Sequence, residues 1–212
     1  RIYDLLAQFK VNFLTTNADT LFEKTLGSEF CHTDFDAEML FNSGNIPRGQ
    51  LFYLHGRYAE GEGERLVFTA AQYVERYNEN RFCDFLRCVF DKECVVFFIG
   101  YGLNEYELID YIATKVGLKN KNNFSLVYSL ESFFSTQEAL FSARRMYFKS
   151  LGIKILPYCI DNGYSELKNV IEKMLNVFKL QECIPVDDYT DILSYINRKC
   201  NKAALAYVNR LL

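Results

Sequence analysis

The stretch "CVVFFIGYGLNEYEL", residues 94–108, combines a predicted strand, a glycine turn and the start of a helix. Residues 94–102 form a continuous apolar run bounded by glycines, which is typical of a central parallel strand covered on both faces. Asn104 suits the N-cap of a helix that we expect to end at Gly117. Because a strand leading through a tight turn into a helix is the repeating unit of α/β folds, this stretch predicts the fold class.

The same alternation continues along the chain. Apolar runs predict further strands over residues 12–17, 51–56, 124–129 and 153–159. Helical spacing of apolar residues predicts helices over residues 69–91 (as one or two helices, opening at a capping Thr69), 136–152 and 164–178. We therefore expect an α/β domain around a mostly parallel sheet over residues 1–180. Residues 181–212 predict no strand, and we interpret them as a helical linker or the start of a C-terminal helical region.

Composition excludes several classes of function. Half of the 212 residues are hydrophobic and the net charge is −3, so neither general disorder nor non-specific nucleic-acid binding is expected. No apolar run is long enough to cross a bilayer, so we expect no membrane partner. Seven cysteines without a C-x-x-C pair fit free thiols in a reducing cytoplasm better than disulfides or a zinc site, and we expect no metal. The chain begins at Arg1 with neither Met nor a signal peptide, so we expect it to be part of a longer protein.

A polar cluster follows the predicted strand at residues 12–17. In "FLTTNADTLFE", residues 13–23, the polar side chains are those of Thr15, Thr16, Asn17 and Asp19. A turn needs about one such residue. Parallel sheets bind ligands at the carboxyl ends of their strands, so this cluster has the position of a ligand site.

Two other strand ends carry candidate site residues. His55 follows the predicted strand at 51–56 and precedes a glycine; it is either functional or a loop histidine with a structural hydrogen bond, whereas we interpret His32 as structural. Gly100 and Gly102, around Tyr101, allow the backbone to approach a phosphate or a ribose at a helix N-terminus. The alternative is an ordinary tight turn, because the third glycine of the dinucleotide fingerprint is missing.

Four motifs in this order resemble the sirtuins: "TTNAD" (15–19), "LHG" (54–56), "VFTAAQY" (67–73) and "FFIGYGLNEYEL" (97–108). The chain most resembles the sirtuin-like NAD-hydrolysing domain of bacterial anti-phage defence proteins, over residues 10–175. It departs from protein-deacylating sirtuins in lacking their two C-x-x-C pairs. It also lacks the Gly-Ala-Gly loop that holds the pyrophosphate, which we expect upstream of Arg1.

The resemblance implies a Rossmann-like fold with helices on both faces of the sheet and NAD as the substrate, cleaved to nicotinamide and ADP-ribose. It implies two catalytic residues, Asn17 to orient water or the ribose hydroxyls and His55 as general base. The implied NAD-binding residues are Thr15, Asn17 and Asp19 around the nicotinamide ribose, and Gly100 and Tyr101 at the adenosine end.

The resemblance also implies an abortive-infection role against phage, a homo-oligomer, and activation by a phage protein or a nucleotide through regions outside this chain. Two other functions stay open. One is a zinc-free NAD-dependent protein deacylase, which would need a peptide groove beside His55. The other is a non-catalytic sensor of NAD or ADP-ribose, which would have no need of a base.

Overall fold

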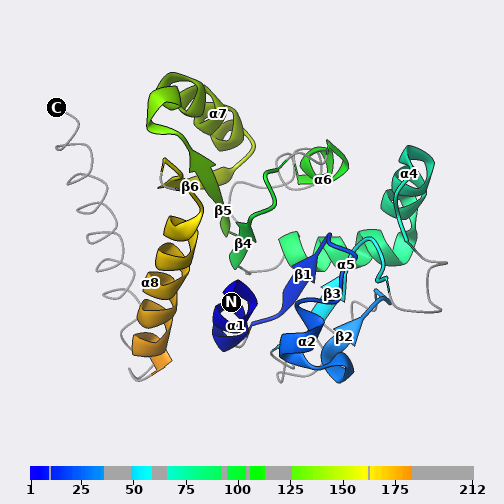
Figure 1. Ribbon diagram of the computed structural model, residues 1–212. Helices are drawn as coiled ribbons and strands as arrows, with labels where there is room; N and C mark the ends of the chain where they lie inside the picture. The colour runs from blue at the N-terminus through cyan, green and yellow to red at the C-terminus, as the bar shows by residue number, and fades with distance from the viewer. Residues whose placement is uncertain are drawn as a thin grey trace. The chain divides into compact units, whose positions relative to one another are not determined.

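The computed structural model describes residues 1–9, 11–35, 49–58, 66–91, 95–103, 106–112, 126–161 and 163–182 (Figure 1). All strand pairs in these residues are parallel, and described helices lie between most pairs of successive strands along the chain. The chain therefore has a Rossmann-like α/β fold, which confirms the predicted fold class. The predicted cap Asn104, the helix end at Gly117 and residues 183–212 lie outside the described residues.

The first sheet has the strand order β1-β3-β2, with bounds β1 Phe13–Thr15, β2 Cys31–His32 and β3 Leu51–Tyr53. Thr15 pairs with Tyr53, and Cys31 pairs with Leu51. The central strand β3 is buried along its whole length. The strands expected within 12–17 and 51–56 are confirmed, whereas β2 was not predicted, because two residues carry no periodic pattern.

Short helices accompany this sheet: α1 Ile2–Leu6, a 3₁₀ turn Ala7–Phe9, α2 Glu23–Leu26 and a 3₁₀ turn Ser28–Phe30. A small apolar cluster joins them to the sheet. Tyr3 of α1 stacks on Phe22 with ring centroids 4.8 Å apart, and Phe22 also meets Phe13 of β1 edge to face at 4.8 Å. Phe22 thus packs the chain segment that follows β1 against the sheet.

The second sheet has the order β4-β5-β6, with bounds β4 Val95–Ile99, β5 Leu126–Phe133 and β6 Ile153–Cys159. Its helices are α6 Tyr106–Tyr111, a 3₁₀ turn Ser135–Gln137, α7 Glu138–Ser150 and α8 Ser165–Glu182. Among the described residues β4 is an edge strand, and its Val95 and Phe97 are exposed. The expectation of a strand covered on both faces was wrong. Phe97 instead stacks on Tyr128 of β5, with ring centroids 5.0 Å apart.

The predicted helical stretch 69–91 forms two helices, α4 Ala70–Asn78 and α5 Asn80–Asp91. Thr69 caps α4 as predicted: its side chain accepts a hydrogen bond from the backbone of Gln72, and the Gln72 side chain accepts one from the backbone of Thr69. This reciprocal capping box fixes where the helix begins. Glu79 has an extended backbone, with φ −70° and ψ 124°, and separates the two helices.

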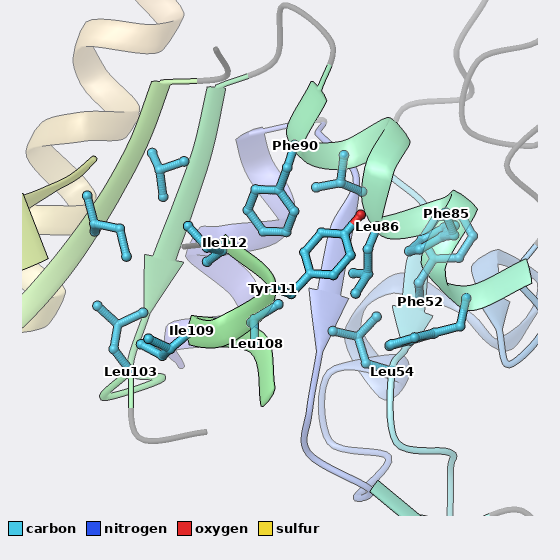
Figure 2. Close-up of a cluster of buried hydrophobic side chains, with 14 of the residues drawn as sticks. Phe52, Leu54, Phe85, Leu86, Phe90, Leu103, Leu108, Ile109, Tyr111 and Ile112 are labelled. Carbon is cyan, nitrogen blue, oxygen red and sulfur yellow. The ribbon is translucent and has the colours of Figure 1, made fainter. Parts of the chain in front are cut away.

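One apolar core supports both sheets within the compact unit Arg1–Glu172. Figure 2 shows side chains from β3, α5 and α6 directed into a common interior, among them Phe52, Leu86 and Tyr111. Val127 of β5 and Ile153 of β6 belong to the same cluster. Each fully buried side chain of this size contributes about 1.5–3 kcal/mol of transfer free energy. Among the described helices, none is long and apolar enough to cross a membrane.

Candidate functional site

Two polar segments meet at the carboxyl edge of the first sheet. Because β1 and β3 are parallel, the loop after β1, residues 15–19, and the segment after β3, residues 54–58, leave the sheet at the same edge. The backbone N–H of Leu54 donates to the carbonyl of Thr15 at 2.8 Å, and that of Tyr58 donates to the carbonyl of Ala18 at 2.7 Å. These bonds hold the 15–19 loop alongside the segment that carries His55.

The side chains of the 15–19 loop have two kinds of role. The hydroxyl of Thr15 accepts a hydrogen bond from the backbone of Asn17 at 3.1 Å, and Oδ1 of Asp19 accepts one from the backbone of Leu21 at 2.9 Å. Local bonds of this type shape turns. Asn17 and Asp19 are exposed, so their remaining donors and acceptors can meet a ligand from solvent.

His55 is almost fully buried, with 3% of its surface exposed. The hydroxyl of Tyr73 lies 3.4 Å from its Nδ1, and the hydroxyl of Tyr77 lies 3.5 Å from its Nε2. The rings of His55 and Tyr73 meet edge to face, with centroids 4.7 Å apart. Both tyrosines come from α4, where residues four apart lie on one helix face. Helix α4 thus presents a polar group to each ring nitrogen.

Burial keeps His55 uncharged. Burial, and then the positive charge of Arg76, lower the pKa of the imidazole from 6.5 to about 4. The imidazole is therefore neutral at pH 7, with one nitrogen protonated and the other free to accept a proton. A tyrosine hydroxyl can donate a hydrogen bond to an unprotonated ring nitrogen or accept one from a protonated ring nitrogen. The two tyrosines are therefore compatible with either tautomer of His55.

Sequence reasoning did not assign a role to either tyrosine. The available signal was their spacing: they lie four residues apart in a helix that begins at Thr69, shortly after the histidine. Whether such a helix face covers His55 depends on the path of the chain between residues 58 and 66, which helical spacing does not report. The tertiary structure therefore adds Tyr73 and Tyr77 to the candidate site.

An ion pair supports the same edge of the sheet. Arg57 Nη1 lies 3.0 Å from Glu23 Oε1, and both side chains are largely buried. The hydroxyl of Tyr53 donates to the backbone carbonyl of Asp19 at 3.3 Å and to Glu23 at 3.4 Å. Burial raises the pKa of Tyr53, so its hydroxyl remains a donor at neutral pH. These contacts connect α2, the 15–19 loop and the end of β3.

Gly100 and Tyr101 lie at the end of β4, in the second sheet. Gly100 has φ +68° and Gly102 has φ +70°, a conformation that glycine adopts readily. Tyr101 stacks on Phe98, with centroids 5.4 Å apart. Leu103, directly after this turn, belongs to the same buried cluster as Leu54, the residue before His55 (Figure 2). The structure thus brings the 15–19 loop and His55 together and places the glycine turn on the other sheet over the same core.

Metal and thiol chemistry receive no support from the described residues. Across them, no three His, Cys, Asp or Glu side chains gather as a metal site would require, and the absence of a metal stays a prediction. The structure describes four cysteines outside disulfides: Cys31, Cys83, Cys88 and Cys159. Burial, and then the negative charge of Glu23, raise the pKa of Cys31 to about 11, so its thiol is protonated and a poor nucleophile at neutral pH.

Comparison with known proteins identifies a domain family. Residues 11–156, which span both sheets from β1 into β6, match the model of the SIR2-like domain family. No curated protein matches the chain. SIR2-like domains are in general NAD-dependent enzymes, which supports an NAD-related function of the sirtuin type. Since the match covers more than half of the chain, this protein belongs to the SIR2-like domain family.

Proposed function

We propose that this domain hydrolyses NAD to nicotinamide and ADP-ribose. The observation that carries the proposal is the uncharged His55 at the end of β3, held between two tyrosine hydroxyls beside the polar 15–19 loop of the neighbouring parallel strand. A neutral imidazole can accept a proton, and the loop offers amide, carboxylate and hydroxyl groups for a ribose and a carboxamide.

The residues have distinct roles in this reaction. The glycosidic bond between the ribose carbon and the nicotinamide nitrogen breaks, and its electron pair leaves with the nicotinamide. The oxygen of a water molecule forms the new bond to that carbon, and the proton of the water passes to His55. Asn17 orients the water or the ribose hydroxyls, Asp19 accepts from the nicotinamide carboxamide, and Thr15 contacts the ribose. A positioned base of this kind contributes about 10²–10⁴-fold in rate.

The burial of His55 places a condition on the proton's path. Both ring nitrogens lie within 3.5 Å of a tyrosine hydroxyl from α4. The proton therefore either moves through a hydroxyl, which accepts it from water while passing its own proton to the imidazole, or reaches His55 after α4 shifts. Replacement of Tyr73 or Tyr77 by phenylalanine separates these routes. If the proton moves through the hydroxyl, the variant loses NAD hydrolysis. If α4 must shift, the variant hydrolyses NAD at least as fast as wild type, because the contacts that hold α4 against His55 are weaker.

Incubation with NAD alone tests the proposal. The full-length wild-type protein is expected to release nicotinamide, and the variants Asn17→Ala and His55→Ala of that protein are expected to lose at least 100-fold in rate, within the range of a general base. His32→Ala is the matched control, because the second histidine lies in β2 and packs against Phe52, with ring centroids 5.0 Å apart. Thermal unfolding shows that each variant is folded. A folded His55→Ala protein that turns over NAD at the wild-type rate removes His55 from its role.

The near-complete burial of His55 also favours a second candidate, a non-catalytic sensor of NAD or ADP-ribose. Such a domain binds NAD in calorimetry without releasing nicotinamide. A deacylase differs from both, since it releases nicotinamide only when an acylated peptide is added. One assay with NAD, with and without such a peptide, separates the three functions.

The wider role follows from the same proposal. Uncontrolled NAD hydrolysis is toxic to the cell that makes the enzyme, so the activity needs a trigger. We place the domain in the cytoplasm as an anti-phage effector that acts as a homo-oligomer and is activated by a phage protein or a nucleotide. NAD hydrolysis by this domain is expected to be metal-independent, so the protein should keep full activity after dialysis against a chelator.

A further inference from the structure

An arginine from α7 contacts the glycine turn that follows β4. The Nη2 group of Arg144 donates to the backbone carbonyl of Gly102, and the same nitrogen lies 3.1 Å from Oε2 of Glu131 in β5. Arg144 thus joins a buried carboxylate to the turn formed by residues 100–103. Nothing in the proposed hydrolysis assigns a role to either side chain.

Glu131 is a buried charge with specific partners. Only 4% of its surface is exposed, and the hydroxyl of the buried Ser129 donates to its Oε1 at 2.7 Å. Since Ile99 pairs with Leu130, Glu131 lies one residue beyond the partner of the last residue of β4. Buried carboxylates are rarely kept without a cation, and Arg144 supplies one. The ion pair is therefore built at the carboxyl end of β4, beside the glycine turn.

The 100–103 turn has a backbone that needs support. After Gly100 at φ +68° and Gly102 at φ +70°, Leu103 takes φ +48°, a region that residues with side chains rarely adopt. Leu103 is buried in the core cluster, which holds the end of the turn (Figure 2). The bond from Arg144 to the Gly102 carbonyl fixes the peptide plane between Gly102 and Leu103, because a peptide unit is rigid and planar.

From these contacts we infer that Arg144, held by Glu131, is a positioning residue that fixes the 100–103 turn for the adenosine end of the dinucleotide. The inference rests on the proposed function for the identity of the ligand. A Cβ placed on Gly100 would meet no atom of the described residues within 4 Å, so among them there is open space beside the turn. Arg144 acts on the ligand through the backbone, and the positions of the turn's amide groups depend on it.

The test uses ligands that contain one half of the dinucleotide. ADP carries the adenosine and both phosphates but no nicotinamide ribose, and nicotinamide mononucleotide carries only the half with the scissile bond. The variant Arg144→Met is expected to weaken ADP binding at least tenfold in calorimetry and to raise the KM for NAD. Its kcat for NAD and its cleavage of nicotinamide mononucleotide should stay within twofold of wild type. Damage to the fold would instead lower the cleavage of both substrates together, and that result overturns the inference.

Two further variants keep the test decisive. Arg144→Lys retains a positive charge beside Glu131 and should unfold at nearly the wild-type temperature, yet bind ADP more weakly, because an ammonium lacks the fixed planar donors of a guanidinium. Arg145→Met, at the exposed neighbouring arginine of α7, is the matched control and should bind ADP like wild type. Unchanged ADP affinity in folded Arg144→Met and Arg144→Lys proteins overturns the inference.

The outcomes separate this inference from the proposed function. If wild-type protein binds ADP and NAD without releasing nicotinamide, hydrolysis is refuted, and the ADP affinities of the variants still decide the role of Arg144. If wild-type protein releases nicotinamide from NAD but does not bind ADP, hydrolysis stands and the inference about the turn is overturned.

Discussion

Replacing His55 by glutamine should reduce the amount of folding stability that the protein loses as the pH falls from 7 to 4. In the folded protein, burial and the charge of Arg76 keep the pKa of this imidazole near 4, whereas in the unfolded chain it returns to about 6.5. Between these values the unfolded state binds a proton that the folded state does not. Acid therefore favours unfolding, and the stability present above pH 6.5 is lost progressively as the pH falls towards 4.

The size of the effect follows from the two pKa values. At about 1.4 kcal/mol for each pKa unit, linkage gives a loss of about 2 kcal/mol at pH 5 and about 3 kcal/mol at pH 4 from His55 alone. Glutamine cannot take up this proton, but its amide can still exchange hydrogen bonds with the tyrosine hydroxyls. The variant will be less stable at pH 7, and the pH dependence of its stability is the informative quantity.

Urea unfolding at pH 7, 6, 5 and 4 measures this dependence. The free energy of unfolding of wild type is expected to fall between pH 7 and pH 5 by about 2 kcal/mol more than that of His55→Gln. His32→Gln changes the only other histidine of the sequence and is measured in parallel for comparison. Parallel curves for wild type and His55→Gln would falsify the claim that the folded protein lowers the pKa of His55.

Three other changes test how the site is supported. Phe82→Ala, at a core position with 0% exposure, should lower the free energy of unfolding by about 3–5 kcal/mol, whereas Phe68→Ala, 71% exposed, should change it by less than about 0.5 kcal/mol in the same urea titration. Arg57→Met leaves the largely buried carboxylate of Glu23 without its partner and should cost about 3 kcal/mol, a loss that the added change Glu23→Gln should partly restore in a double-mutant cycle. Thr69→Ala removes the capping box and should cost about 1 kcal/mol, with faster amide exchange at the start of α4 than in wild type.

Most strands and helices could be predicted from local sequence, because each of them carries either a continuous apolar run or its own period. The continuous apolar run at 94–102 predicted β4, and the helical spacing after Thr69 predicted α4 and α5, including their possible division. Capping by Thr69 needs only a neighbour three residues away, so it too is a local property. The polar 15–19 loop stood out because four polar side chains exceed what a turn requires.

Local sequence did not predict the position of each strand in its sheet. The weaker pattern at residues 51–56 contains the fully buried central strand β3, whereas the strongest apolar run forms β4, an edge strand among the described residues with Phe97 exposed. Burial depends on which strands pair across long stretches of chain, and the two-residue strand β2 exists only because of its partner. A period of two or of 3.6 reports the type of an element and not its neighbours.

Residues adjacent along the chain were enough to predict the fold class, the polar loop after β1 and the histidine after β3. Only the tertiary structure decided that Tyr73 and Tyr77 enclose His55 and that Arg144 joins Glu131 to the 100–103 turn. The reason is physical. A lowered pKa and a supported turn arise from burial and from contacts between segments 13 to 42 residues apart, which are made only when the chain packs.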